Sequence, residues 1–564
     1  MSTLATMSHF LKSAPFNLDS EALAWVDKTL ASLSQHEKIG QLFTLASRTN
    51  AIEDQRAVLG FAPGGVFRPA SGTLEQVWQA NRFLVENSPV PLLFSGDIEG
   101  GGAGYRINTE LPNPLGLAAA DDVALSRAVV DVMAREARAL GYNWSFTPLL
   151  DINATFRSAI VGTRSYGSDP AKVLKQALIN VEQFREAGIA TAAKHWPGEG
   201  FDDRDQHLVG TINPLSWPQW QATFGTLYSA LIDAGVTSVM SAHIALPSFI
   251  REHFPDAGRE AFEPASVSRL LNQRLLRQTL GFNGLIVSDA TGMAGLTSWL
   301  SREALVPAVI ESGCDMFLFT EGDPAIDFNY MLKGLREGRL SEQRLDEAVT
   351  RVLGLKAHLG LHRQSAEQQV PSLPDARSTI GTAASRAIAA QAASASITLV
   401  KDVPGLLPVD LNRHRRVVIA GYEQHHPVRK GPPIILAGLL EEEGFEVRAY
   451  DPQQPPTPYD TDLLVYVIAE EAVATRGHIY LDWQRLHGSL KGSLRRHWQD
   501  VPTLLISLGQ PYYLYDAPLA PTSINAYSAI EPVQRALVDK LLGRSSFTAI
   551  DPVDSFCGQE VARY

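Results

Sequence analysis

Eight short apolar segments between residues 41 and 320, the later ones separated by longer helical segments, constrain the fold more than any other feature of the chain. The apolar segments have the length and composition of buried β-strands. Strands joined by helical crossovers predict an α/β fold with a (β/α)8 TIM-like barrel, and an open doubly wound sheet is the alternative. The eight predicted strands are QLFTLA, GGVFR, PLLFSGD, WSFTPLLD, TAAKHW, TSVMSAH, GLIVSDA and CDMFLFTE.

Polar side chains gather where these predicted strands end, and their distribution favours the barrel. A barrel brings all its strand ends to one face, where its active site lies, whereas an open sheet concentrates them at one crevice. The residues in question are Asp97, Glu99, Asp151, Lys194, His195, His243, Asp289 and Glu321.

A second α/β unit follows the barrel. A long helical stretch over residues 341–362 closes the first unit, and a Pro- and Ser-containing segment without periodicity comes next. Beyond it the strand-like runs RVVIAGY, FEVRAYD, DLLVYVIAE and TLLISLG alternate with helical patterns. We therefore predict a catalytic barrel over residues 1–362, a linker over 363–382, and a smaller C-terminal α/β sandwich domain over 383–564.

Charge and cysteine usage exclude several classes of protein. The net charge of −12 and the pI near 5.7 argue against nucleic acid or an anionic membrane as a partner, because either would require a basic face. With only 2 cysteines, a disulfide framework is excluded, and a reducing cytoplasm is the predicted location. The N-terminal segment has no apolar region of a secretory signal, and no apolar run is long enough for a membrane span. The sequence does not predict an oligomeric state.

The segment KHWPGEGFDDRDQH, residues 194–207, reads as a loop that carries many titratable groups. Asp205 and His207 lie two positions apart, a spacing that lets a carboxylate hold an imidazole in one tautomer. A solvated surface loop is the alternative interpretation. A zinc site built from His195, Glu199, His207 and the Asp residues of the loop is a third, but no H-E-x-x-H or comparable spacing supports it, so no metal is predicted.

Three strand-end residues also have more than one interpretation each. Asp289 follows the strand GLIVS, where a carboxylate serves as a nucleophile, stabilises a cationic transition state, or caps the helix that follows. Lys194 and His195 are either hydrogen-bond donors to a polyhydroxy ligand or members of a strand-end salt bridge.

Taken in order, several motifs resemble those of family 3 glycoside hydrolases, strongly over residues 30–360 and more weakly beyond. The D-x-H that follows K-H-x-P-G is typical of the β-N-acetylglucosaminidase branch of that family. The motifs are LSQHEKIGQLF, FTPLLDIN, GTRSYGSDP, KHWPGEG with DQH, VMSAHIALP, PASVS and LGFNGLIVSDATGM, followed later by SITLVKD, SLGQPYYL and INAYS.

The resemblance implies a retaining, two-step mechanism on a barrel. It implies that Asp289 is the nucleophile and that His207, on a mobile loop and oriented by Asp205, is the general acid/base. No metal or cofactor is implied. The predicted substrate-binding residues are Asp97, Arg164, Lys194, His195, His243 and Met293.

Three positions depart from the family pattern. Ala290 follows the predicted nucleophile where relatives have Asp or Trp, and Glu199 stands where relatives have His or Asp. The usual DQEGGRV is DIEGGGAGYR here, so that Arg106 lies farther along the chain than the family arginine.

The predicted function is a retaining exo-β-N-acetylglucosaminidase that releases terminal GlcNAc from chitin- or peptidoglycan-derived fragments. Glycosidic cleavage needs an anion on one face of the sugar and a proton donor at the leaving oxygen, and an imidazole suits proton transfer at neutral pH. The predicted partners are a small carbohydrate substrate with water or phosphate as the acceptor. The alternatives are a β-N-acetylglucosaminide or β-glucoside phosphorylase, a broad β-glucosidase, and a non-catalytic carbohydrate-binding protein.

Overall fold

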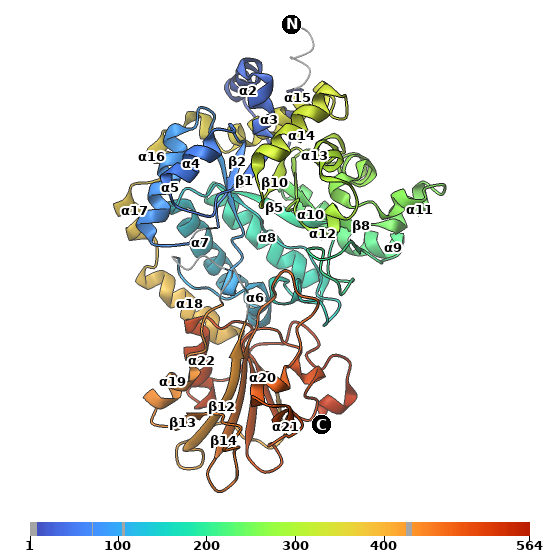
Figure 1. Cartoon of the computed structure of the whole chain (residues 1–564). Helices are drawn as coiled ribbons and strands as arrows, with labels where there is room; N and C mark the ends of the chain where they lie inside the picture. Colours follow the sequence, from blue (N-terminus) through green and yellow to red (C-terminus); the bar gives the residue numbers. More distant parts are fainter. Residues whose placement is uncertain (1–7, 70, 104–107, 425–430) are drawn as a thin grey trace.

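The protein folds into a barrel and a second α/β unit beside it (Figure 1). The computed structural model describes residues 8–69, 71–103, 108–424 and 431–564. In the view of Figure 1 the C-terminal unit, in orange and red, lies below the barrel. The helices α6 (Pro114–Ala120) and α18 (Ala383–Ser396) lie where the two units meet. The polar residues at the ends of the barrel strands lie on the face of the barrel that is turned toward the C-terminal unit.

The first sheet has eight strands, all of them parallel to their neighbours, in the order β10-β1-β2-β3-β4-β5-β7-β9. Its two outer strands approach each other, since an isolated parallel bridge joins Val287 to Met316. The predicted barrel is therefore confirmed and the open sheet is wrong. The strands are β1 (Phe43–Ala46), β2 (Gly65–Phe67), β3 (Leu93–Gly96), β4 (Trp144–Ser145), β5 (Ala190–Trp196), β7 (Ser238–Ser241), β9 (Leu285–Ser288) and β10 (Phe317–Phe319).

Helices surround this sheet and begin at residues suited to cap them. Asp122 and Asp169 accept hydrogen bonds from main-chain N–H groups in the first turns of α7 and α8, and Pro170 occupies the first position of α8. None of the helices in the described ranges is both long enough and apolar enough to cross a membrane. The main helices of this unit are α2 (Ser20–Ser32), α3 (Gln35–Gln41), α4 (Ile52–Leu59), α5 (Leu74–Asn87), α6 (Pro114–Ala120), α7 (Val123–Ala139), α8 (Pro170–Glu186), α10 (Thr226–Asp233), α13 (Arg302–Glu311), α14 (Pro324–Arg336) and α15 (Glu342–His358).

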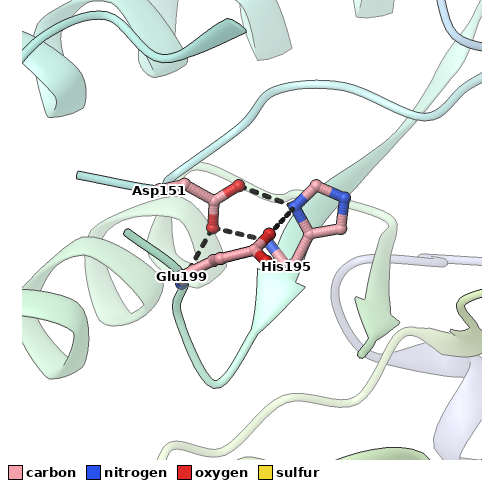
Figure 2. A group of neighbouring side chains, drawn as sticks. All are labelled: Asp151, His195 and Glu199. Atoms are coloured by element: carbon pink, nitrogen blue, oxygen red, sulfur yellow. Dashed lines mark hydrogen bonds and ion pairs between the residues drawn. The ribbon is translucent and has the colours of Figure 1, made fainter. Parts of the chain in front are cut away.

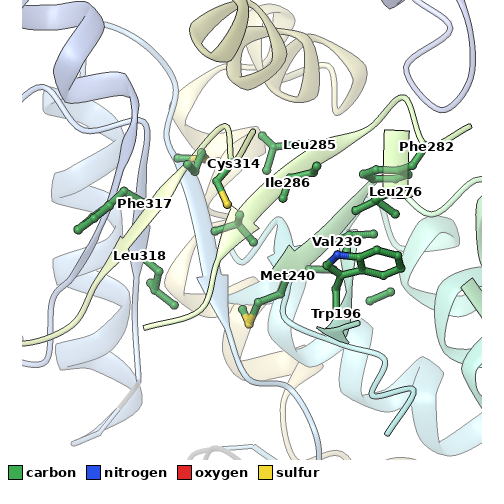
Figure 3. Close-up of a cluster of buried hydrophobic side chains, with 14 of the residues drawn as sticks. Trp196, Val239, Met240, Leu276, Phe282, Leu285, Ile286, Cys314, Phe317 and Leu318 are labelled. Atoms are coloured by element: carbon green, nitrogen blue, oxygen red, sulfur yellow. The ribbon is translucent and has the colours of Figure 1, made fainter. Parts of the chain in front are cut away.

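Apolar side chains from neighbouring strands fill the barrel region, as Figure 3 shows for Val239, Ile286 and Phe317. Cys314 is a free, fully buried thiol among them. Because each strand contributes to one continuous apolar cluster, the strand ends are held in fixed positions relative to one another.

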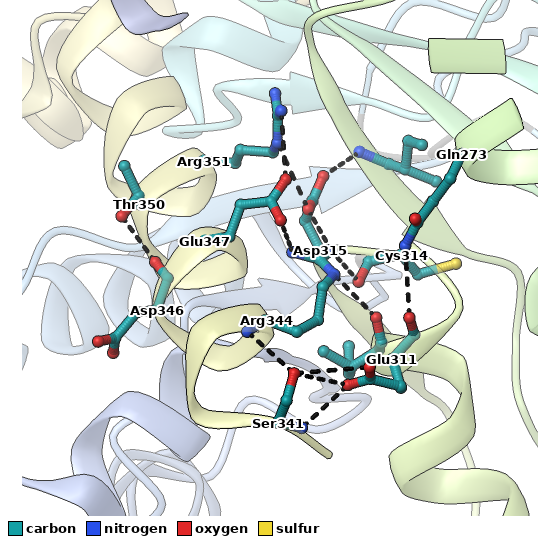
Figure 4. A network of polar contacts seen from close by, with 12 residues as sticks. Gln273, Glu311, Cys314, Asp315, Ser341, Arg344, Asp346, Glu347, Thr350 and Arg351 are labelled. Atoms are coloured by element: carbon teal, nitrogen blue, oxygen red, sulfur yellow. Dashed lines mark hydrogen bonds and ion pairs between the residues drawn. The ribbon is translucent and has the colours of Figure 1, made fainter. Parts of the chain in front are cut away.

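A buried ion-pair network holds the amino ends of the strands, opposite the polar strand ends (Figure 4). Asp315, just before β10, accepts hydrogen bonds from Arg277 and Arg344 at 2.6 Å each. Its Oδ2 also accepts from the main chain of Ile286 at 2.8 Å, which ties β9 to the start of β10. The network therefore stabilises the barrel and is remote from the face on which the polar strand ends meet.

The second unit is a mixed sheet covered on both faces, which confirms the predicted sandwich. Its order is β11-β16-β15-β14-β12-β13, with only the β11–β16 pair antiparallel. Successive residues of β14 alternate between two apolar clusters, since Val465 packs with α19 and α22 while Tyr466 packs with α20. The elements are β11 (Thr398–Asp402), β12 (Arg416–Glu423), α19 (Leu436–Glu442), β13 (Glu446–Ala449), β14 (Leu463–Ala469), α20 (Trp483–His487), α21 (Leu490–Ser493), β15 (Thr503–Ser507), β16 (Thr522–Asn525) and α22 (Glu531–Leu541).

The predicted linker, residues 363–382, contains two short helices, α16 (Ala366–Gln369) and α17 (Leu373–Thr379). Ser365 and Gln368 form a capping box that starts α16. Arg138 of the barrel donates to the carbonyl oxygens of Gln368 and Gln369 at 2.7 Å, so the segment lies on the barrel surface. The next helix, α18 (Ala383–Ser396), contacts α6 and α7 of the barrel and α22 of the second unit. The domain limits remain predictions.

Candidate active site

A cavity of about 470 Å3 lies at the carboxyl ends of the barrel strands, and a loop of the C-terminal unit forms part of its wall. This volume is in the range of pockets that hold small ligands. Seven of the predicted site residues line it, namely Asp97, Arg164, Lys194, His195, His207, Asp289 and Met293. Residues on its wall that the sequence analysis did not assign to the site include Arg48, Phe67, Glu99, Thr320, Glu321 and the segment 472–475.

Asp289 lies directly after β9 and is 8% exposed. The main-chain N–H of Asp289 donates to Ser241 of β7, and its carboxylate accepts from the N–H of Ala290 at 2.7 Å. Burial would raise the pKa of this carboxyl, but the neighbouring His195 and His243 and the Ala290 N–H together lower it below its usual value. The alternative role as a helix cap is not seen, because the cap of the following helix is Met293. The cavity thus presents a carboxylate anion.

Asp205 and His207 form a hydrogen-bonded pair. Oδ1 of Asp205 accepts from the main chain of His207 at 2.8 Å and lies 2.7 Å from Nδ1 of its ring. The Asp205 side chain is 1% exposed and the His207 side chain 26%. A carboxylate that accepts from Nδ1–H fixes the imidazole tautomer and leaves Nε2 for a ligand. The D-x-H spacing therefore places a carboxylate-bound imidazole on the cavity wall.

The loop that carries this pair is bonded to the segment that follows the predicted nucleophile. The N–H groups of Ala294 and Gly295 donate to the carbonyl oxygens of His207 and Gln206 at 3.1 and 3.0 Å. A Cβ at Gly295 would lie 2.6 Å from the Gln206 oxygen, so a side chain there would push the two segments apart. These contacts set the loop against the strand end that carries Asp289.

A cluster of two cations and two carboxylates forms another part of the wall. Glu99 accepts two hydrogen bonds from Arg164 and lies 2.8 Å from Nζ of Lys194. Lys194 also donates to Asp97 at 2.7 Å. Burial would raise the pKa of Glu99, but the two cations hold it well below its usual value. The two interpretations of Lys194, a strand-end salt bridge and a ligand-binding group, are therefore compatible. Asp97, with 28% of its side chain exposed, is the member of the cluster most accessible to a ligand.

His195 belongs to a second buried cluster, with Asp151 and Glu199 (Figure 2). Its Nδ1 lies 2.6 Å from Oδ2 of Asp151 and 3.5 Å from Oε2 of Glu199. Oδ1 of Asp151 accepts from the main-chain N–H groups of His195 and Glu199 at 3.1 and 3.0 Å. Burial, followed by the charges of Asp151 and Asp205, raises the pKa of Glu199 well above its usual value. The surroundings of Glu199 therefore favour the protonated form of its carboxyl.

The same three residues are the candidate metal ligands, since their ligand atoms lie within 4.8 Å of one another. Both oxygens of Asp151 already lie within hydrogen-bond distance of nitrogen atoms of His195 or Glu199, at 2.6 to 3.1 Å. The chemistry of the three side chains thus fits a hydrogen-bond network better than a metal centre. His207, the other residue of the zinc interpretation, is bonded to Asp205 instead.

His243 is fully buried and does not line the cavity. Its Nε2 lies 2.9 Å from the carbonyl oxygen of Ala290, and its Nδ1 lies 2.8 Å from the Ser266 hydroxyl. Since a carbonyl only accepts, Nε2 carries a hydrogen and donates it to Ala290. Burial lowers the pKa of His243. This placement differs from the prediction that His243 binds substrate, because one ring nitrogen contacts the segment after β9 and the other contacts Ser266.

The positions at which the sequence departs from the family pattern lie in different places relative to the cavity. The short side chain of Ala290 lies on the cavity wall, and Glu199 lies behind it in the Asp151 cluster. Arg106 lies outside the described residues. Glu99, Glu321 and residues 472–475 line the cavity but were not predicted as site residues. Glu99 and Glu321 lie at the ends of predicted strands, and this position could have indicated them, whereas nothing in the sequence indicated residues 472–475.

The chain was compared with known proteins. Residues 34–355 match the model of the glycosyl hydrolase family 3 N-terminal domain. Over 568 residues the chain is 39% identical to a beta-N-acetylglucosaminidase/beta-glucosidase of Cellulomonas fimi, with 97% of this chain and 99% of that protein covered. It is 29% identical over 341 residues to the beta-hexosaminidase LpqI of Mycobacterium tuberculosis, with 58% of this chain and 84% of that protein covered.

Solved structures show the same two-unit fold. The beta-glucoside phosphorylase BglX bound to 2FGlc has a TM-score of 0.91 at 36% identity, with 97% of this chain and 99% of that one covered. A family 3 beta-N-acetylglucosaminidase from Paenibacillus sp. str. FPU-7 has a TM-score of 0.78 at 23% identity, with 93% and 99% covered, and shares the fold.

Proposed function

The chain belongs to glycosyl hydrolase family 3, and we propose that it is a retaining, exo-acting β-N-acetylglucosaminidase that releases terminal GlcNAc from chitin- or peptidoglycan-derived fragments. One observation carries the proposal: a carboxylate, Asp289, and a carboxylate-bound imidazole, His207, lie on the wall of one cavity. The dual name of the Cellulomonas fimi relative supports β-glucosides as a second class of substrate.

In the first step, the Asp289 carboxylate attacks the anomeric carbon and the glycosidic C–O bond breaks. The leaving oxygen takes the Nε2 proton of the His207 imidazolium, whose charge the Asp205 carboxylate stabilises through Nδ1–H. In the second step, water attacks the anomeric carbon and the bond from this carbon to Asp289 breaks. The water gives a proton to His207, which restores the acid. Two displacements at one carbon return the starting configuration, so the product keeps the β-anomer.

The cation cluster is proposed to hold the sugar. Lys194 and Arg164 are oriented by the buried carboxylate of Glu99, and Asp97 presents an acceptor beside them. Such pre-set donors and acceptors fix the anomeric carbon relative to Asp289 without reorganisation during the reaction.

Phosphorolysis is the second candidate, and the beta-glucoside phosphorylase at 36% identity favours it. A neutral imidazole beside the acceptor does not repel an anion, whereas a carboxylate at ~4 Å would do so by roughly 4 kcal/mol at an effective dielectric of about 20. Of the cations near the site, Lys194 and Arg164 are bound to Glu99, and Arg204 is paired with Asp202. Arg48 lies on the wall and contacts only the Thr320 carbonyl oxygen, at 3.4 Å, among the described residues.

The test is turnover of nitrophenyl β-GlcNAc and nitrophenyl β-glucoside, each with and without millimolar phosphate, with the products resolved by NMR. Free β-GlcNAc as the first-formed product in both conditions is the expected result. A sugar 1-phosphate as the main product with phosphate present would replace the hydrolase by the phosphorylase. An α-anomer as the first-formed free sugar would overturn the two-step mechanism, and no turnover of either glycoside would leave the non-catalytic carbohydrate-binding protein.

A further inference from the structure

The carboxylate of Asp205 receives a hydrogen bond from the C-terminal unit. Its Oδ1 is occupied by the main chain and ring of His207, and its Oδ2 accepts from the main-chain N–H of Thr475 at 2.7 Å. Both oxygens of a carboxylate that is 1% exposed are thus held by N–H groups. One of those donors comes from a residue 270 positions away in the sequence.

Thr475 belongs to a strap, defined as residues 472–475, that follows β14 and forms part of the cavity wall. The N–H groups of Ala472 and Val473 donate to Oγ1 of Thr163 and to the carbonyl oxygen of Ala159, at 2.8 and 3.0 Å. The strap therefore runs along the barrel from the neighbourhood of Arg164 to Asp205. Each of these three contacts uses its main chain and none of them its side chains.

The backbone of Thr475 has an uncommon conformation. Its φ is +68°, in the left-handed region that a β-branched residue rarely adopts. Such a conformation costs free energy and persists where the surroundings hold it in place. Here it directs the N–H of residue 475 to the carboxylate that orients the imidazole.

The side chains of the C-terminal unit near this point are engaged elsewhere. Glu470 pairs with Arg476 at 2.9 Å. Glu471 accepts from Gly102, Asn113 and Ser528 at 2.9, 3.1 and 2.6 Å, which ties the start of the strap to the barrel. Neither carboxyl lines the cavity. What reaches the proton-transfer pair from this unit is the main-chain N–H of the strap.

We propose that Thr475 is a positioning residue for proton transfer: its main-chain N–H fixes Asp205, and Asp205 fixes the ring of His207. The C-terminal unit is then part of the acid/base apparatus although it supplies no proton. The inference rests on the proposed function, because it requires His207 to protonate the leaving oxygen.

Thr475→Pro tests the proposal, because proline has no N–H to donate. Thr475→Gly is the matched control, since glycine keeps the N–H and adopts the same backbone conformation. A single glycine inserted between Val473 and Ala474 displaces the N–H by a second route. Each variant is first compared with the parent by circular dichroism and thermal unfolding.

The readout is kcat/KM across aryl β-GlcNAc substrates with leaving groups of increasing basicity. We expect Thr475→Pro and the insertion to lose about 10-fold or more on the most basic leaving group, as a fraction of the 10²–10⁴-fold that general acid catalysis provides. The most acidic leaving group should change by less than about 3-fold, because it needs no proton. Thr475→Gly should keep the parent's dependence on the leaving group, because the N–H of residue 475 is retained.

A parent-like series for a folded Thr475→Pro or insertion variant would overturn the proposal, as would an equal loss in Thr475→Gly. If neither variant folds, hydrogen–deuterium exchange of the peptide that contains the strap decides. Exchange there should be faster in Asp205→Ala than in the parent, and unchanged exchange would also overturn the proposal. His207→Ala, assayed in parallel, separates the two failures: if it shows no dependence on the leaving group, the proposed function itself is wrong.

Discussion

Arg164 donates two parallel hydrogen bonds to Glu99, from Nε to Oε2 and from Nη2 to Oε1, both at 2.8 Å. The Glu99 carboxylate is 1% exposed and lies 2.8 Å from Nζ of Lys194 as well. A two-point pair of this kind fixes the plane of the guanidinium as well as its distance. Two cations on the cavity wall are therefore oriented by one carboxylate.

Replacing Glu99 by glutamine is expected to lower the free energy of unfolding by about 3–5 kcal/mol, because removing one partner leaves buried charges without compensation. Urea unfolding at neutral pH measures the change. Glu321→Gln is the control, since Glu321 lies on the same wall but is exposed. A loss below about 1 kcal/mol, typical of exposed ion pairs, would contradict the structural role of Glu99.

Asp289→Ala is expected to abolish turnover, because Asp289 lines the cavity and is the carboxylate proposed as the nucleophile. In the parent, a slow 2-fluoro glycoside with an activated leaving group should leave one glycosyl adduct on the peptide that contains Asp289. Intact mass and peptide mapping detect it. An adduct on another peptide, for example one that contains Glu321, would move the nucleophile elsewhere.

His207→Ala is expected to impair glycosides with basic leaving groups by 10²–10⁴-fold, and activated aryl glycosides far less. Asp205→Asn should show the same pattern with a smaller loss, since an imidazole remains but its Nδ1 partner is changed. Arg204→Ala on the same loop is the control, because Arg204 pairs with Asp202 and does not line the cavity. Equal losses on every substrate would make the pair structural.

The sequence was sufficient for the barrel, and most of the residues predicted for the site line the cavity. Buried strands show as apolar runs, and the residue after each run lies at the carboxyl face of a barrel, as Asp97 and Asp289 do. The D-x-H spacing likewise predicted a contact between neighbours in the chain, and Asp205 and His207 make it.

Contacts between distant segments could not be predicted in this way. The bond from Thr475 to Asp205 depends on how the second unit sits on the barrel, and no local pattern reports that arrangement. His243 shows the converse error: its strand-end position is right, but its ring is turned into the interior, where Ser266 and Ala290 engage it. The linker looked irregular because its helices are too short to show periodicity.

The C-terminal carboxyls are expected to supply no catalytic proton. Glu470→Gln and Glu471→Gln should keep the parent's dependence on the leaving group, because Glu470 pairs with Arg476 and Glu471 is bonded to the barrel through Gly102 and Asn113. The same aryl glycoside series measures this, with thermal unfolding to report any loss of stability. If either variant mimics His207→Ala, the acid/base assignment moves to that glutamate.

Glu199 should make stability depend on pH. Burial, and then the charges of Asp151 and Asp205, raise its pKa well above the ordinary value, so the folded protein keeps a proton that the unfolded chain releases. The contribution of that proton is fully present below the unfolded pKa of about 4.3 and is lost as pH rises toward the folded pKa.

Glu199→Gln retains the shape of the side chain and cannot ionise. Relative to this variant, the parent should lose up to about 1.4 kcal/mol of unfolding free energy per pH unit as pH rises above the unfolded pKa of about 4.3, because one group releases at most one proton. Urea unfolding at pH 5, 6.5 and 8 gives the difference, and Glu321→Gln, an exposed carboxyl on the same cavity, corrects for general charge effects. Parallel curves for the parent and Glu199→Gln would show that Glu199 is ionised in the fold, and the cluster of Asp151, His195 and Glu199 would then carry a net negative charge beneath the cavity.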